Sequence, residues 1–276
     1  KNITKSFSGV AALRNAELEL RSGEVVALMG ENGAGKSTLM KILTGIYRKD
    51  AGEIRYLGRE VEYRGPAESE EAGIVIVHQE LNMMNDLTVA QNLFIGKEIM
   101  KGALIDDQSM KRKAAELFSL LNISIDPAEK IGNLTVGKQQ MVEIAKALSV
   151  QARILIMDEP TSALSSREIE ELFRIIRKLK EQGHGIVYIS HRLDELSHIA
   201  DRVSIMRDGK MVSSGSFSEY SMDHIISLMV GREIREQYPR IDCAKGRKIF
   251  EVKNLNAGRK VRNISFSLYE GEIVGI

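Results

Sequence analysis

The stretch Gly30-Glu31-Asn32-Gly33-Ala34-Gly35-Lys36-Ser37 decides the fold, because it fits the phosphate-binding pattern G-x-x-x-x-G-K-[ST]. It follows an apolar strand-like run at 25–29 and precedes a helical stretch at 36–43, which is the context that this pattern requires. The glycines let the backbone wrap around a phosphate, and the start of the helix adds partial positive charge. An ordinary glycine-rich turn is the alternative, but it would have to match both the four fixed positions and this context.

Two side chains of this loop have expected roles toward a bound nucleoside triphosphate. Lys36 is expected to reach the β- and γ-phosphates, because its flexible ammonium group follows the glycine-rich turn directly. The hydroxyl of Ser37 is expected to hold Mg²⁺. The loop therefore predicts nucleotide binding and places the phosphates at the start of the helix.

Five apolar runs separated by helical stretches predict a mainly parallel α/β sheet, since strands covered on both faces are continuously hydrophobic. Residues before Gly23 have the character of an N-terminal antiparallel β subdomain, with a turn at Ser8-Gly9. A hairpin is predicted at Asp208-Gly209. The stretch 85–150 reads as an inserted helical subdomain without strand-like runs. The predicted strands are 25–29, 74–77, 154–157, 186–189 and 203–207, and the predicted helices are 36–43, 89–96, 110–121, 139–148 and 168–182.

A second chemical signal is the run Ile154-Leu155-Ile156-Met157-Asp158-Glu159, a hydrophobic strand that ends in two carboxylates. In this pattern Asp158 holds Mg²⁺, and Glu159 orients and deprotonates the attacking water. Many strands end in acidic loops, so the pattern gains its weight from following a phosphate-binding loop. His191 and Gln79 also follow predicted strands, at the edge of the sheet where open α/β folds bind ligands.

Composition excludes several classes of protein. The 276 residues include 39 basic and 38 acidic side chains, so the basic surplus of a nucleic-acid binder is absent. The single cysteine, Cys243, excludes an intrachain disulfide framework and a multi-thiolate metal site. The longest apolar runs fall far short of the roughly 20 residues that cross a bilayer. We therefore expect a compact globular protein that carries no spanning segment of its own.

A repeat at an offset of 248 residues suggests a duplicated domain, with six matches in fifteen positions. The charged, weakly apolar stretch 231–248 suits a linker. The expected organisation is a first domain at 1–230, this linker, and the truncated start of a second domain at 249–276. The offset would place the second phosphate-binding glycine at about position 278. The matches are Arg14-Asn15, Leu20, Gly23-Glu24 and Val26 with Arg262-Asn263, Leu268, Gly271-Glu272 and Val274.

Taken together, these residues resemble the ATP-binding-cassette (ABC) family over nearly the whole chain. In that family an aromatic residue before the phosphate-binding loop stacks on adenine, and Phe7 matches it. A glutamine that touches Mg²⁺ and the attacking water matches Gln79, and a histidine that contacts the γ-phosphate matches His191. The resemblance implies ATP and Mg²⁺ as cofactors, with contacts that run from Gly30 to Thr38.

Within the family, the chain is most similar to fused double-cassette subunits of bacterial monosaccharide importers of the ribose type. The stretches 31–41, 78–82, 139–146 and 229–232 carry this likeness. It implies that the partners are transmembrane permease subunits, a second cassette of the same polypeptide and, through the permease, a sugar-binding protein. It also implies a peripheral location on the cytoplasmic face of the bacterial inner membrane.

Two motifs depart from the family pattern. The signature, commonly L-S-G-G-Q, reads Leu134-Thr135-Val136-Gly137-Lys138, so a branched side chain stands where the backbone must approach a phosphate. The D-loop, commonly S-A-L-D, ends in Ser165 and lacks its carboxylate. We expect the composite site that uses this signature to be impaired. The resemblance implies that the other site, which pairs this phosphate-binding loop with a signature in the second cassette, is competent.

Three functions remain open from the sequence. The first is an ATPase motor that powers sugar import. The second is a soluble cassette ATPase that acts on ribosomes or nucleic acid, which would be expected to carry basic insertions or long charged arms. The third is a nucleotide-binding scaffold without turnover, against which the intact Asp158-Glu159 and His191 weigh.

Overall fold

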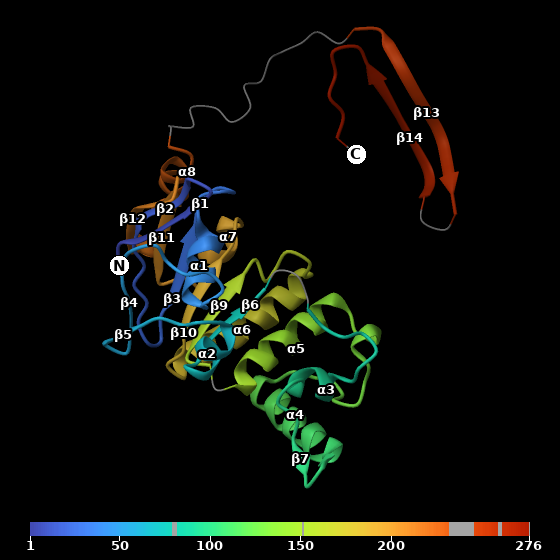
Figure 1. Ribbon diagram of the computed structural model, residues 1–276. Coiled ribbons are helices and arrows are strands. Elements are labelled where there is room, and N and C mark those ends of the chain that lie inside the picture. The colour runs from blue at the N-terminus through green and yellow to red at the C-terminus, as the bar shows by residue number, and fades with distance from the viewer. Residues whose placement is uncertain (79–81, 151, 232–245, 259–260, 276) are drawn as a thin grey trace. The chain divides into compact units, whose positions relative to one another are not determined.

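The computed structural model describes residues 1–78, 82–150, 152–231, 246–258 and 261–275. The chain divides into two compact units, Lys1–Glu233 and Ile234–Ile276, and Figure 1 labels helices and strands of the first and the strands β13 and β14 of the second. No helix in the described part of the chain combines the length and the hydropathy that a membrane span needs.

A six-stranded sheet forms the centre of the first unit, in the order β12-β11-β3-β10-β9-β6. The five strands from β11 to β6 are parallel, and β12 joins antiparallel through the predicted turn at Asp208-Gly209. Both turn residues have positive φ, as a tight two-residue hairpin requires. All five predicted strands are confirmed. The bounds are β3 Val25–Met29, β6 Ile74–Val77, β9 Ile154–Asp158, β10 Gly185–Ile189, β11 Arg202–Arg207 and β12 Lys210–Ser216.

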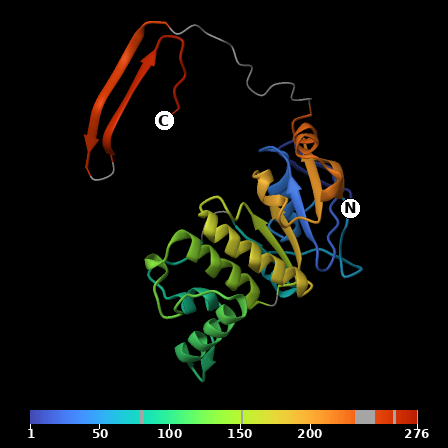
Figure 2. The same ribbon diagram turned by 180° about the vertical axis from the view of Figure 1, so that it is seen from behind.

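The sheet is buried on both faces, because alternate residues of its strands enter two different hydrophobic clusters. Leu155 and Met157 of β9 face one cluster and Ile156 faces the other. Helix α1 (Lys36–Leu43) packs in the second cluster through the buried side chains of Leu39, Met40 and Ile42. Helices α5, α6 and α8 contribute to the first cluster, and α5 and α6 run side by side in Figure 2. Their bounds are α5 Val136–Ser149, α6 Ser166–Glu181 and α8 Met222–Val230, and the short α7 is Leu193–Leu196.

Along the chain, one antiparallel pair of strands precedes β3 and another follows it. The pair β1–β2 turns at Ser8-Gly9, as the sequence predicts, and both residues have positive φ. The pair β4–β5 and helix α2 were not predicted, because three-residue strands are too short to show alternation and α2 buries only Ser69. The bounds are β1 Ile3–Phe7, β2 Val10–Ala16, β4 Ile54–Tyr56, β5 Arg59–Val61 and α2 Pro66–Glu71.

The segment 85–150 is mainly helical, as expected, but the expectation that it contains no strand is wrong. Two strands of two residues each form a hairpin around Gly102, and runs of this length leave no periodic signal. The elements are α3 Val89–Phe94, β7 Met100–Lys101, β8 Leu104–Ile105, α4 Asp107–Leu121, the 3₁₀ turn Ile131–Asn133 and α5.

Three helices begin earlier than their apolar periodicity predicts, because a polar capping turn precedes the first buried residue. The side chain of Asp106 caps α4, and that of Thr135 caps α5. Ser165 caps α6 in a reciprocal capping box with Glu168. The caps therefore move these starts to Asp107, Val136 and Ser166.

The described part of the second unit contains one antiparallel pair, β13 (Lys248–Ala257) and β14 (Val261–Tyr269). It repeats local details of the first unit at the offset of 248 residues. Asn15 and Asn263 both adopt left-handed backbone conformations, with φ values of 55° and 53°. The carboxylates of Glu24 and Glu272 each accept a hydrogen bond from the backbone N–H three residues earlier, at 2.8 and 3.2 Å. The repeat thus extends from sequence to backbone conformation.

Candidate functional site

The phosphate-binding loop lies between β3 and α1, and tertiary packing constrains its backbone. Gly35 has a φ of 105°, and a Cβ atom there would lie 2.8 Å from Leu13 and 2.9 Å from the carbonyl oxygen of Ala12. A side chain at this position would be both strained and obstructed. The carbonyl of Gly35 then accepts the first helical hydrogen bond, from the N–H of Leu39. The N-terminus of α1 therefore opens directly onto the loop.

Lys36 folds back over the loop that precedes it. Its Nζ donates hydrogen bonds to the carbonyl oxygens of Gly30, at 2.7 Å, and Glu31, at 3.1 Å. Partial burial lowers the pKa of Lys36, while the negative charges of Asp158 and Glu159 act in the opposite direction. The ammonium group therefore lies in the field of both carboxylates, so the structure brings these three predicted residues together.

The two carboxylates come from the carboxyl end of β9. Asp158 is the last residue of the strand, and burial followed by repulsion from Glu159 raises its pKa. Glu159 has a φ of 47°, an uncommon conformation for a side chain of this size. Its backbone N–H donates to the carbonyl oxygen of Ile189 at 2.9 Å, which anchors it to the neighbouring strand β10. Backbone strain at such a position is typical of functional sites.

His191 follows β10 and meets Glu159 across the strand ends. Its Nδ1 lies 3.1 Å from the Oε1 of Glu159. The His191 side chain is 66% exposed and that of Glu159 21% exposed, so the pair is open to a ligand above the sheet. Ser37 is exposed and Thr38 half-buried at the start of α1. Gln79, predicted to join this group, lies outside the described residues.

A protein-family model described as ABC transporter matches residues 13–162, which is just over half of the chain. The chain belongs to the ABC transporter family. Its fold is the P-loop nucleoside triphosphatase (NTPase) fold of ABC ATPases, with a mainly parallel sheet, an N-terminal antiparallel β subdomain and an inserted helical subdomain.

Solved ABC cassettes share this fold. A nucleotide-free ATP-binding cassette from an ABC transporter superposes with a TM-score of 0.73 at 27% identity, covering 84% of this chain and 93% of that one. The ADP conformation of another ABC transporter cassette gives a TM-score of 0.73 at 28% identity, covering 85% and 97%.

Curated relatives are much closer in sequence. A putative ribose/galactose/methyl galactoside import ATP-binding protein of Burkholderia cenocepacia is 54% identical over 276 residues, which is 99% of this chain and 54% of that protein. A similarly named protein of Albidiferax ferrireducens is 51% identical over 278 residues, covering 100% and 55%. The chain spans about half the length of the curated relatives it matches.

Next to the candidate nucleotide site, a buried carboxylate connects the loops that carry Glu159 and His191. Glu195 of α7 is 4% exposed. Its Oε2 accepts hydrogen bonds from the hydroxyls of Thr161, at 2.7 Å, and Tyr188, at 3.3 Å, and its Oε1 pairs with Arg192 at 2.6 Å. Thr161 is two residues after Glu159, and Arg192 is the residue after His191. Glu195 therefore connects both loops, and we call the group of Glu195, Thr161, Tyr188 and Arg192 the brace.

No sequence pattern marks this brace, because its members lie on three separate elements. Burial, with the negative charge of Glu195 next in importance, raises the pKa of Tyr188, so its hydroxyl stays protonated and available as a donor. Only the packing of α7 against the sheet brings the group together.

Phe7, expected to stack on adenine, ends β1 and is 40% exposed. Its ring lies 5.2 Å from that of Tyr47 at an interplanar angle of 68°, an edge-to-face arrangement. Lys5 lies over the Phe7 ring at 5.5 Å, and Lys41 lies over Tyr47 at 5.4 Å. Tyr47, which the sequence analysis did not single out, therefore fixes the orientation of the Phe7 ring.

The signature segment Leu134–Lys138 has a different environment from the phosphate-binding loop. Leu134 is buried, and the N–H of Lys138 donates to the hydroxyl of Thr135 at 3.4 Å. Val136 is 46% exposed at the first position of α5. The carboxylate of Glu168 covers Gly137 so closely that a Cβ atom there would collide with it. This segment therefore contacts α6 through Glu168.

Proposed function

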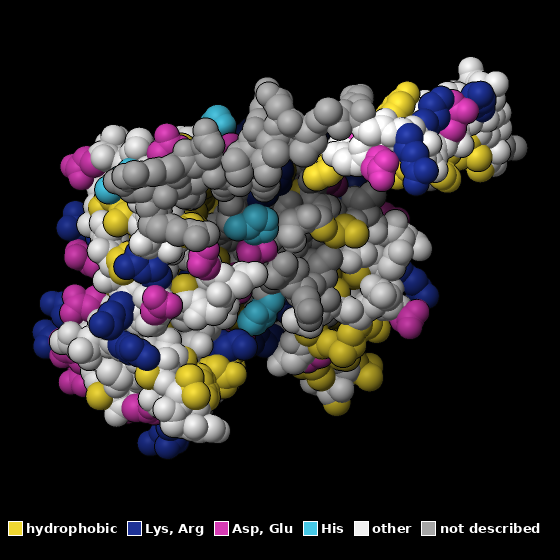
Figure 3. Space-filling view, turned by 90° about the horizontal axis from the view of Figure 1, so that it is seen from above, with side chains coloured by type: hydrophobic (Ala, Val, Ile, Leu, Met, Phe, Trp, Pro, Cys, Tyr) yellow, Lys and Arg dark blue, Asp and Glu magenta, His cyan; other side chains and the backbone are white. Residues whose placement is uncertain are grey.

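We propose that the chain is the first ATP-binding cassette of a double-cassette subunit that energises monosaccharide import, with ribose as the sugar. The convergence of Lys36, Asp158, Glu159 and His191 at one edge of the sheet carries the proposal. The import ATP-binding proteins that are 51 to 54% identical to the chain support the transport assignment. Basic and acidic side chains are interspersed on the face shown in Figure 3, which suits a protein partner better than a nucleic acid.

In this proposal ATP binds with adenine on Phe7 and its phosphates in the loop from Gly30 to Thr38. Backbone N–H groups at the start of α1 and the Lys36 ammonium stabilise the phosphate charge. Lys36 exchanges its present carbonyl acceptors for phosphate oxygens, which are stronger partners because they are charged.

The donor set near the loop fits Mg²⁺. Ser37 offers an exposed hydroxyl, and Asp158 offers a carboxylate whose charged form is disfavoured by burial and by Glu159. A cation beside Asp158 relieves this cost, and oxygen ligands are those that Mg²⁺ prefers. Gln79 is proposed as a further ligand. When bound, Mg²⁺ neutralises charge on the β- and γ-phosphates.

Glu159 is proposed as the general base that takes a proton from the attacking water. The Nδ1 of His191 lies 3.1 Å from the Glu159 carboxylate, and the Nε2–H of the doubly protonated imidazole is the donor proposed to meet the γ-phosphate. The positive φ of Glu159 and its backbone bond to Ile189 fix the carboxylate at the strand end. Positioning of this kind lowers the barrier, because the water is oriented before the transition state.

The second cassette is proposed to begin at residue 249, after a linker at 231–248 that follows the first cassette at 1–230. The repeated conformation of Asn15 and Asn263 and the repeated hydrogen bonds of Glu24 and Glu272 support this organisation. ATP would then be sandwiched between the two cassettes. The subunit would dock on permease subunits at the cytoplasmic face of the inner membrane, and a sugar-binding protein would act through the permease.

Sugar uptake in a strain lacking the gene tests the proposal, using the full-length protein with its permease subunits. Wild-type protein is expected to restore uptake of ribose, with galactose and methyl galactoside assayed in parallel, and Glu159→Gln is expected not to restore any. Asp194→Asn, a change of an exposed acidic residue on α7, is the matched control. Equal uptake with wild type and Glu159→Gln would contradict an ATP-driven importer. Loss of ribosome or nucleic-acid function, with uptake of every sugar intact, would favour the non-transport cassette ATPase.

A further inference from the structure

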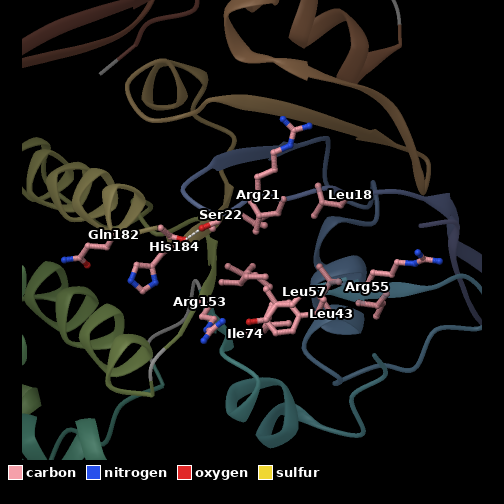
Figure 4. A pocket seen from close by; sticks show the side chains of 18 residues that line it. Leu18, Arg21, Ser22, Leu43, Arg55, Leu57, Ile74, Arg153, Gln182 and His184 are labelled. Carbon is pink, nitrogen blue, oxygen red and sulfur yellow. Dashed lines mark hydrogen bonds between the residues drawn. The ribbon is translucent and has the colours of Figure 1, made fainter. Parts of the chain in front are cut away.

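A cavity of about 460 Å³ lies at the opposite edge of the sheet from the phosphate-binding loop. Its walls are formed by the last residue of α1, Leu43, and the first residues of three strands, Ile74, Ile154 and Gly185. Figure 4 shows Leu43, Leu57 and Ile74 together at its centre, with Arg153 and His184 to one side. A volume in the range of roughly 300–1,000 Å³ with mostly apolar walls is typical of a small-molecule site.

Two residues that line this cavity each have a buried polar atom without a hydrogen-bond partner among the described residues. These atoms are the hydroxyl oxygen of Tyr56 and the Nδ1 of His184. Leaving such groups unpaired is costly, and native structures pair the great majority of them. A ligand with hydrogen-bonding atoms at one end would satisfy both.

The charge around the cavity has one sign. Its lining includes three arginines and one histidine, and none of the described residues that line it is acidic. Arg21 pairs with the exposed Glu19 at 3.2 Å, and Arg55 pairs with the half-buried Glu53 at 3.0 Å. Arg153 forms no ion pair with the described part of the chain and stands at the rim in Figure 4. The cavity therefore offers an uncompensated cation beside an apolar interior.

We propose that this cavity binds a small amphipathic anion, whose apolar body packs between Leu43 and Ile154 and whose carboxylate or phosphate head meets Arg153, Tyr56 and His184. An anionic head is the partner that satisfies an arginine and two unpaired polar atoms together. An apolar body is required because the walls beneath are aliphatic.

The site is distinct from the nucleotide site, although the same elements carry both. Helix α1 begins with Lys36 and ends at the cavity with Leu43, and β9 begins at the cavity with Ile154 and ends with Asp158. A five-residue strand spans about 16 Å, so the occupant and ATP do not touch. Anion binding is therefore expected to survive Lys36→Ala, which separates failure of this proposal from failure of the ATPase assignment.

A tryptophan reporter provides the test, because the chain has no native tryptophan. Leu18→Trp places the indole in the cavity lining, and its fluorescence in the full-length protein is titrated with decanoate, decanol and decyltrimethylammonium at constant ionic strength. Decanoate is expected to bind at least about tenfold more tightly than either analogue, since only it has an anionic head. Equal affinities for decanoate and decanol would overturn the proposal.

Variants in the same background locate the site. Arg153→Ala is expected to weaken decanoate binding about tenfold, and Tyr56→Phe about fivefold, in line with the loss of one charged and one neutral hydrogen bond. Tyr56→Phe removes an unpaired buried hydroxyl and so keeps the fold. Arg59→Ala, on the adjacent strand β5 and outside the lining, is the matched control and is expected to change nothing. Calorimetric titration of decanoate into the same variants without the reporter gives a second measurement. Affinities that are equal in Arg153→Ala, Tyr56→Phe and Arg59→Ala would place binding elsewhere.

Discussion

The phosphate-binding loop and the signature segment both lead into a helix, yet their helix starts differ in how far the backbone is open. At the start of α1, Gly35 leaves the loop without a capping side chain. At the start of α5, the Thr135 side chain caps the helix, Val136 adds a branched side chain, and Glu168 covers Gly137. Backbone N–H groups bind phosphate only where no side chain or carboxylate blocks the approach.

The comparison indicates that one cassette can carry an intact half-site, which is the phosphate-binding loop with its neighbouring carboxylates, and an altered half-site, which is the signature segment. The intact half brings together Lys36, Asp158, Glu159 and His191, with Glu195 as a buried support. In the altered half, a carboxylate lies where phosphate charge would be expected to approach. The chain is therefore expected to contribute catalysis through its phosphate-binding loop and much less through its signature.

The largest effect is expected from Lys36→Ala, compared with Lys138→Ala in the signature segment. Loss of Lys36 removes charged hydrogen bonds to the phosphates, worth about 1.5–3 kcal/mol each, so Mg-ATP affinity is expected to fall at least about 100-fold. Lys138→Ala is expected to change it less than about threefold. Isothermal titration calorimetry measures both constants, and an unchanged affinity in Lys36→Ala would remove the phosphate-binding role of the loop.

Glu159→Gln is expected to separate binding from hydrolysis in the full-length protein. The amide cannot accept the proton of the attacking water, and a general base contributes roughly 10²–10⁴-fold to the rate. ATP affinity is expected to stay within about threefold of wild type, because the phosphates are held by other groups. Steady-state phosphate release and calorimetry give the two values, and normal turnover would exclude Glu159 as the base.

A smaller loss of turnover is expected from Glu195→Gln, which keeps an acceptor for Thr161 and removes the charge that pairs with Arg192. The Arg192 side chain is 42% exposed and stays hydrated, so the loss of its partner is expected to cost only about 1 kcal/mol of stability. If the brace positions Glu159 and His191, kcat falls about tenfold while KM for ATP stays within about twofold.

Rescue separates positioning from folding at this residue. Glu195→Gln combined with Arg192→Met removes both charges and is expected to recover stability without recovering kcat. Asp194→Asn, its exposed neighbour, controls for the helix. Joint recovery of kcat and stability in the double variant would assign Glu195 a structural role only.

The smallest effect is expected from Glu168→Ala in the signature half. Hydrogen bonds from the backbone N–H and hydroxyl of Ser165 lower the pKa of Glu168. As part of the cap, ionised Glu168 is expected to stabilise the folded state by about 1 kcal/mol. This contribution is fully present above the pKa of Glu in the unfolded chain, near 4.3. It is lost as the pH falls through the lower pKa that Glu168 has in the folded state. The melting temperature is expected to drop a few degrees at pH 7 and to approach that of wild type as pH falls below the lowered pKa of Glu168. Glu170→Ala is the exposed control, and an equal drop in both variants would contradict the capping role.

Features encoded locally were predictable from the sequence, and features made by packing were not. The loop from Gly30 to Ser37, the strand ending in Asp158 and the turn at Asp208-Gly209 depend on neighbouring residues, so their patterns are visible in the chain. Glu195 and Tyr47 acquire their roles only when separate elements meet.

Short elements were missed for a different reason. The strands β4, β5, β7 and β8 have two or three residues each, which is less than one full alternation on a face. The cover of Gly137 by Glu168 was also invisible, because the two residues are 31 positions apart and meet only when α6 docks beside α5. The sequence predicted an impaired composite site from Val136 and from the missing D-loop carboxylate at Ser165, and the cover of Gly137 by Glu168 is a further feature of the same segment.

The most direct test of the unequal half-sites is the steady-state ATPase rate of the full-length protein, assembled with its permease subunits, in Glu159→Gln and Thr135→Ala. We predict that Glu159→Gln lowers kcat at least about 100-fold. We predict that Thr135→Ala, which removes the signature hydroxyl, leaves kcat within about twofold of wild type. Loss of turnover in Thr135→Ala with turnover retained in Glu159→Gln would contradict the account.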